Sequence, residues 1–114
     1  MGQFKDSMME GYGEFYWPDG KKYIGFYKQD KKEGLGLFAW PDNNKIYVGC
    51  WVNGKQEGVG MMKHNYLTKY GFWENGNRQT WIKGAWALNK YLKNDTYLEF
   101  FQKDPEDMIN YFMK

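Results

Sequence analysis

The residues best suited to chemistry are few: one cysteine, one histidine, and regularly spaced carboxylates and lysines. Cys50 and His64 would make a nucleophile–base pair only if their side chains met. If a hairpin turns within residues 53–56, the two lie on paired strands but about four residues out of step, at roughly 3.3 Å per residue. Cys50 is therefore predicted to be a small strand residue and His64 a surface or ladder residue. A second histidine or cysteine for a structural zinc site is absent from the sequence, so we expect no metal and no cofactor.

The carboxylates Glu10, Glu33 and Glu57 precede three Gly-x-Gly motifs, at steps of 23 and 24 residues. Catalysis by paired acids needs two carboxylates facing one pocket. Glutamates that recur beside turns are explained more simply by cross-strand pairing with neighbouring lysines. The Gly-x-Gly motifs lack the third glycine and the following helix of a dinucleotide-binding loop. We therefore predict that the chain is not an enzyme.

Four basic residues are expected at equivalent hairpin turns, lining one rim of a sheet: Lys31, Lys32, Lys55 and Arg78. A cationic rim can bind anionic lipid heads, at about 1 kcal/mol per lysine. The nearby glutamates offset much of that charge, and a solvated edge protected by charge is the simpler interpretation. The net charge of +2 does not favour a nucleic-acid partner.

The elements that must position these residues follow from composition and spacing. The chain of 114 residues fits one small domain, and its 21% aromatic content excludes a disordered tail. No stretch approaches the roughly 20 apolar residues of a membrane-spanning helix. A single cysteine excludes an internal disulfide and fits a reducing, intracellular compartment.

Several residue types recur in register at about 23 residues, so the chain is a repeat array. The recurring rings and glycines form three rows: Tyr23, Tyr47 and Tyr70; Phe4, Tyr27, Trp51 and Trp73; Gly25, Gly49 and Gly71. Residues 47–51 alternate as a half-buried strand does, and Asn53-Gly54 has hairpin-turn chemistry. Glycine weakens a strand interior unless another group approaches its backbone closely. We therefore expect rings to pack on bare glycine backbone, with ring pairs adding about 0.5–1.5 kcal/mol each.

These residues resemble the MORN repeat, which runs roughly Tyr-x-Gly-x-Trp-x-x-Gly and then Gly-x-Gly. The segment 47–60 carries the pattern most fully, from Tyr47-Val48-Gly49-Cys50-Trp51 to Gly58-Val59-Gly60, and residues 23–42 repeat it. The likeness covers about residues 2–82. The first unit is clipped, because residues 2–13 align with 25–36. The unit from Tyr70 lacks its Gly-x-Gly, so the array is expected to end there, and His64 interrupts the row of Trp17 and Trp40.

After Trp81 the pattern becomes helical. Asp104-Pro105 followed by acids is a strong helix start, Thr96-x-x-Glu99 is a capping box, and residues 85–93 predict a further short helix. We therefore predict a mainly β fold. It comprises an elongated, single-layer, twisted antiparallel meander of three to four hairpins over residues 1–82, and a helical segment over residues 83–114. That segment is interpreted as a cap on the array, with a docking element as the alternative.

One sheet cannot bury both its faces, so part of the ring surface is expected to bind a protein, either a helix or a neighbouring subunit. The ring residues predicted to contact that partner are Tyr23, Tyr27, Trp40, Tyr47, Trp51, Tyr70 and Trp73. The resemblance implies scaffolding in ciliary, cytoskeletal or membrane-junction assemblies. It leaves two alternatives open: a peripheral module on anionic phospholipid, and an accessory part of a larger enzyme such as a phosphoinositide kinase. An exposed first strand would favour pairing with a second copy. The bias to lysine and asparagine suggests an AT-rich genome, such as that of a protist.

Overall fold

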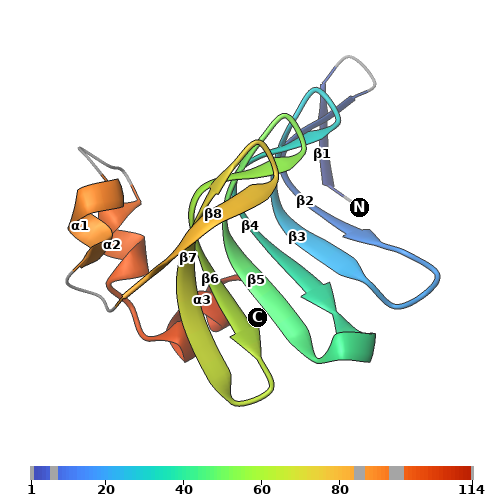
Figure 1. Ribbon diagram of the computed structural model, residues 1–114. Coiled ribbons are helices and arrows are strands. Elements are labelled where there is room, and N and C mark those ends of the chain that lie inside the picture. Colours follow the sequence, from blue (N-terminus) through green and yellow to red (C-terminus); the bar gives the residue numbers. More distant parts are fainter. Residues whose placement is uncertain (1, 6–7, 84–86, 93–96, 114) are drawn as a thin grey trace.

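Each repeat folds as a β-hairpin, because residues that alternate in polarity flank a short turn. The computed structural model describes residues 2–5, 8–83, 87–92 and 97–113. Its eight strands are β1 (Gly2–Lys5), β2 (Met8–Tyr16), β3 (Lys22–Lys28), β4 (Lys31–Trp40), β5 (Lys45–Val52), β6 (Lys55–His64), β7 (Leu67–Glu74) and β8 (Asn77–Ile82). They form one antiparallel sheet in sequence order (Figure 1). The predicted meander of hairpins is confirmed.

The predicted hairpin turn at Asn53-Gly54 is confirmed, and the β7–β8 turn uses the same pair of residue types. Asn53 and Gly54 have φ of 52° and 83°, and Asn75 and Gly76 have φ of 53° and 88°. Two successive positive φ values are what a two-residue hairpin turn requires. The β4–β5 connection instead contains a short 3-10 helix over Pro41–Asn43.

A row of glycines crosses the middle of the sheet, each opposite the next: Gly2, Gly13, Gly25, Gly36, Gly49, Gly60 and Gly71. A Cβ atom on Gly36 would overlap the Tyr23 ring, and one on Gly60 would overlap the Tyr47 ring. The row ends at β8, where Trp81 stands opposite Gly71. The expected packing of rings on glycine backbone is therefore confirmed.

Within the described residues, three helical segments follow the sheet: α1 (Leu88–Tyr91), α2 (Leu98–Phe101) and α3 (Pro105–Phe112). The predicted start of α3 at Asp104-Pro105 is confirmed. The helix predicted over 85–93 is seen over Leu88–Tyr91, while residues 84–86, 93 and the capping residue Thr96 lie outside the described residues.

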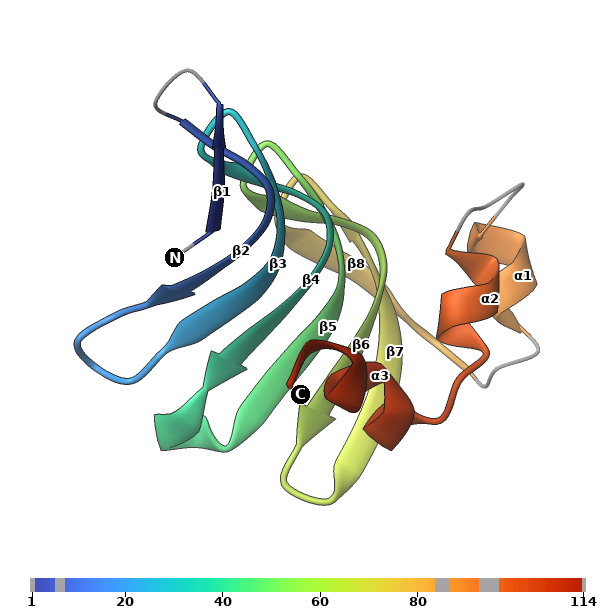
Figure 2. The same cartoon turned by 180° about the vertical axis from the view of Figure 1, so that it is seen from behind.

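The helices are placed against one side of the sheet. In Figure 1, α1 and α2 stand beside β7 and β8, and Figure 2 shows α3 lying across the sheet on the face seen from behind. Contacts join α3 to β4 and α1 to β6. No helix in the described ranges is long and apolar enough to cross a membrane.

The two sheet faces carry separate cores. On the helix-covered face, Leu37, Val48 and Met61 are fully buried in one cluster with residues such as Met108 of α3. The other face carries a cluster of rings. With the helices included, the described residues extend 41 × 33 × 26 Å, and the radius of gyration is 13.8 Å, close to the roughly 13 Å of a compact domain of this length.

Candidate functional site

A continuous chain of rings covers one face of the sheet, here called the aromatic face. The buried rings of this face are Tyr23, Tyr27, Tyr47, Trp51 and Trp73. The half-buried side chains packed against them are the rings of Trp17, Phe38, Trp40 and Trp81 and the methionines Met9 and Met62. The central rings meet edge to face, with centroids 5.5 Å apart for Tyr23–Trp51, 5.4 Å for Tyr47–Trp51 and 5.0 Å for Tyr47–Trp73. This geometry is favourable for aromatic pairs, so the rings stabilise one another as well as the sheet.

The buried phenols of the aromatic face are neutral, and two of them are hydrogen-bonded to backbone. The Tyr23 hydroxyl donates to the carbonyl oxygen of Phe26 at 2.9 Å, and the Tyr47 hydroxyl donates to that of Cys50 at 3.2 Å. Burial raises the pKa of Tyr27 to about 12 and raises the pKa values of Tyr23 and Tyr47 further above their ordinary value. These side chains therefore stay uncharged across the physiological range of pH.

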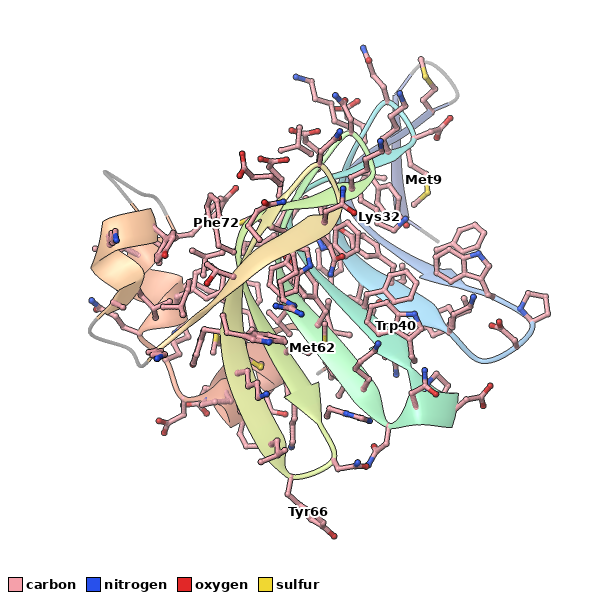
Figure 3. All side chains as sticks on the ribbon, in the orientation of Figure 1. Met9, Lys32, Trp40, Met62, Tyr66 and Phe72 are labelled. Atoms are coloured by element: carbon pink, nitrogen blue, oxygen red, sulfur yellow. The ribbon has the colours of Figure 1, made fainter. Side chains whose placement is uncertain are left out.

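Five of the seven predicted partner-binding rings are buried on the aromatic face: Tyr23, Tyr27, Tyr47, Trp51 and Trp73. Tyr23 and Tyr47 are 0% exposed, so they support the surface from below. Trp40 is half-buried on the same face, and Figure 3 shows it over the sheet together with Lys32 and Met62.

Tyr70 does not share this face, so its placement in one row with Tyr23 and Tyr47 is wrong. It pairs with Ile82 and packs against the helix-covered cluster. Tyr70 directly precedes Gly71, whereas Tyr23 and Tyr47 precede their glycines by two residues. A shift of one residue turns a side chain to the opposite face of a strand. Lys69 consequently takes the place of a tyrosine on the aromatic face.

The basic residues predicted to line one rim lie on two different surfaces of the sheet. Lys31 and Lys55 are exposed at the starts of β4 and β6. Lys32 instead turns onto the aromatic face, where its Nζ atom lies 5.5–5.8 Å from the centroids of four rings. Burial lowers the pKa of its ammonium group. Arg78 stacks on Trp81, with its Cζ atom 4.2 Å from the ring centroid. Alternation along the strand explains the division, because adjacent residues face opposite ways.

The repeating glutamates accept hydrogen bonds from backbone N–H groups of the following hairpin turns. The prediction that they pair with lysines is wrong. A carboxylate oxygen of Glu33 accepts a hydrogen bond from the backbone N–H of Asn53 at 3.0 Å, and Glu57 accepts one from Asn75 at 2.8 Å. Glu10 accepts one from the backbone N–H of Gln29. Each glutamate therefore holds the turn of the following hairpin in place. Their spacing reflects the architecture of the repeat.

Cys50 and His64 lie on different faces. Cys50 packs against the helix-covered cluster, whereas His64 borders a pocket on the aromatic face, so they do not form a dyad. Within the described ranges, no group of histidine, cysteine and carboxylate side chains could hold a metal ion.

The pocket on the aromatic face has a volume of about 420 Å³ and is lined by residues of β4 to β8. Three indoles, those of Trp40, Trp73 and Trp81, share its walls with the basic side chains of Lys45, Lys69 and Arg78. Sequence reasoning missed Lys45, Lys69 and Trp81 as members of this site. The one available signal was the shortened spacing from Tyr70 to Gly71, which moves Lys69 to the face where a ring was expected.

Comparison with protein families agrees with this geometry. A family model described as the MORN repeat matches three consecutive segments, residues 1–22, 23–45 and 47–64, which together make up more than half of the chain. The last matched segment ends at His64, beside the pocket. No curated protein matches the chain significantly.

Proposed function

Because this chain belongs to the MORN-repeat family, whose repeats serve as protein- and membrane-interaction modules, we propose that it is a non-catalytic scaffold that holds a protein partner on its aromatic face. The observation that carries the proposal is the difference in cover between the two faces. Helices α1 to α3 pack on one face, while the described residues place no element over the other. Half-buried Trp40 and Phe38 remain accessible there. Accessible rings gathered on one surface are typical of protein-binding sites.

The direct test places a photo-crosslinking amino acid, benzoylphenylalanine, at Trp40 of the full chain in its native cell. The matched control carries it at Lys103, which is exposed beyond α2. We expect a discrete protein adduct from position 40 and none of the same mass from position 103. Adducts that are identical from both positions, or absent from position 40, would contradict a protein partner on the aromatic face.

A peripheral membrane role is the second candidate, supported by exposed Lys31 and Lys55 at neighbouring hairpin ends. Each lysine near an anionic membrane contributes about 1 kcal/mol. Flotation with vesicles that contain phosphatidylserine tests this role, with Lys31→Glu/Lys55→Glu as the variant. Binding that is salt-sensitive and lost in this variant would favour the membrane. Equal recovery with and without phosphatidylserine would exclude an anionic lipid surface.

A further inference from the structure

The pocket on the aromatic face lies where the pattern of rings stops. One row of paired residues crosses the strands through Phe15, Tyr23, Phe38 and Tyr47, and then continues into Met62 and Lys69. The first four are rings, and the last two are not. The loss of ring volume at β6 and β7 opens a pocket of about 420 Å³ between Trp40 and Trp81, a size that receives a side chain and its neighbours.

The charges around this pocket have one sign. The Nζ atom of Lys45 lies 4.8 Å from the Trp40 ring centroid, and that of Lys69 lies 5.1 Å from the Trp81 centroid, on which Arg78 also stacks. None of the described residues that line the pocket is an aspartate or glutamate. The ion pairs in the described part of the chain join Lys21 to Asp19 and Lys63 to Glu106, and none includes these three cations. The rings hold the cations at the wall without neutralising them.

Two exposed apolar side chains lie at the hairpin beside the pocket. Leu67 lines its edge and is 67% exposed, and the neighbouring Tyr66 at the tip of the β6–β7 hairpin is 99% exposed. Figure 3 shows Tyr66 projecting away from the sheet. Exposed apolar side chains beside the pocket suit a chain that lies along the surface rather than a small molecule enclosed within it.

We propose that the pocket binds an acidic peptide segment of the protein partner. One aromatic or aliphatic side chain of that segment enters between Trp40, Trp73 and Trp81, and flanking carboxylates bind Lys45, Lys69 and Arg78. Large apolar anchors in a pocket supply affinity, and carboxylates opposite uncompensated cations supply selectivity. This inference rests on the proposed scaffold function and deepens it by naming the chemistry of the partner.

Selection from a random twelve-residue peptide library displayed on phage tests the proposal with the full chain as bait. We expect the selected peptides to be rich in Asp and Glu around one Trp, Phe or Leu. The double variant Lys69→Glu/Arg78→Glu should bind the selected peptides with at least tenfold lower affinity. The matched control Lys31→Glu/Lys55→Glu makes the same change in net charge at exposed hairpin ends. Its affinity for the selected peptides should fall less than twofold.

Failure to enrich acidic peptides, or an equal loss of binding in both double variants, would overturn the proposal. If the glutamate variant does not fold, Lys69→Gln/Arg78→Gln keeps the test available, with at least fivefold weaker binding expected. Vesicles that contain phosphatidylserine test the competing possibility. If the chain binds these vesicles, if Lys69→Glu/Arg78→Glu abolishes that binding, and if no acidic peptide is enriched, the pocket is a lipid site. A protein adduct at position 40 without acidic peptides would defeat this inference and leave the scaffold function standing.

Discussion

The two faces of the sheet bury their side chains by different means. On the helix-covered face, Ile24, Leu37, Val48 and Met61 form one cross-strand row that becomes a core only where helices cover it. On the aromatic face, Tyr47 reaches 0% exposure with no described element above it. Its ring lies down on glycine backbone, which offers a flat surface without side chains. A single sheet can therefore build one core from within, but it needs a second layer for the other.

The same contrast decides which face is available to partners. The aliphatic row is hidden beneath Met108 and its neighbours, whereas the rings leave a polar and aromatic surface open. The fully buried phenols of Tyr23 and Tyr47 donate to carbonyls of their own strands, so these polar groups are satisfied without a covering layer. Four experiments test this difference between the faces.

Alkaline pH should have the largest effect and should act through the aromatic face. Tyr23, Tyr27 and Tyr47 keep their protons when folded, with the pKa of Tyr27 at about 12, but lose them near pH 10 when unfolded. Above pH 10 the folded state binds more protons, so the free energy of unfolding falls as pH rises. Each tyrosine lowers the free energy of unfolding by about 1.4 kcal/mol per pH unit, so the three together lower it by about 4 kcal/mol per pH unit. Urea denaturation between pH 8 and 12 should show steep loss above pH 10.

Tyr27→Phe is the matched control for the alkaline measurement, because it removes one ionising group and keeps the ring. We expect near-unchanged stability at pH 7 and a shallower decline between pH 10 and 12. A decline that keeps its slope in this variant would mean that alkaline unfolding begins elsewhere in the molecule.

Gly60→Ala should destabilise the protein by about 3 kcal/mol, since the added methyl group would displace the buried Tyr47 ring. Gly54→Ala is the comparison. Its φ of 83° strains an alanine, but nothing lies within 4 Å of the added atom, so about 1 kcal/mol is expected. Thermal and urea unfolding measure both. Similar losses in the two variants would contradict the role of glycine backbone as a platform for rings.

Met108→Ala tests the other face. Met108 is 0% exposed under α3, and its truncation should cost about 2–3 kcal/mol. Hydrogen exchange should show faster exchange in α3 while amides of β4 and β5 keep their protection. If the amides of β4 and β5 lost as much protection as those of α3, the strands would depend on the helices as well. The two faces would then not differ in their dependence on a second layer.

The smallest effect is expected at the ion pair that joins β6 to α3. Lys63 Nζ lies 2.7 Å from Glu106 Oε1, with the two side chains 30% and 67% exposed. A pair this exposed contributes about 0.5 kcal/mol or less. A double-mutant cycle with Lys63→Met and Glu106→Gln measures the coupling, which should vanish in 1 M salt. Coupling above about 1.5 kcal/mol would show that charge, not apolar packing, fastens the helices.

Much of the fold could be predicted from the sequence, because the information is local and periodic. The Asn53-Gly54 turn, the alternation of residues 47–51 and the Asp104-Pro105 helix start each use chemistry within a few neighbours. The candidate site was less predictable. The rows drawn by spacing put Tyr70 among the rings and Lys32 on a rim, and both errors are slips of one residue in a pattern with a period of two.

The sequence by itself determined that rings and glycines recur in register, and hence that hairpins stack into one meander. Only the tertiary structure decided which side each ring occupies, which face the helices cover, and that Trp40, Lys69 and Trp81 surround one pocket. The physical reason is range. Strand register and turn chemistry are set by neighbours along the chain, whereas a pocket depends on residues that cross-strand pairing brings together.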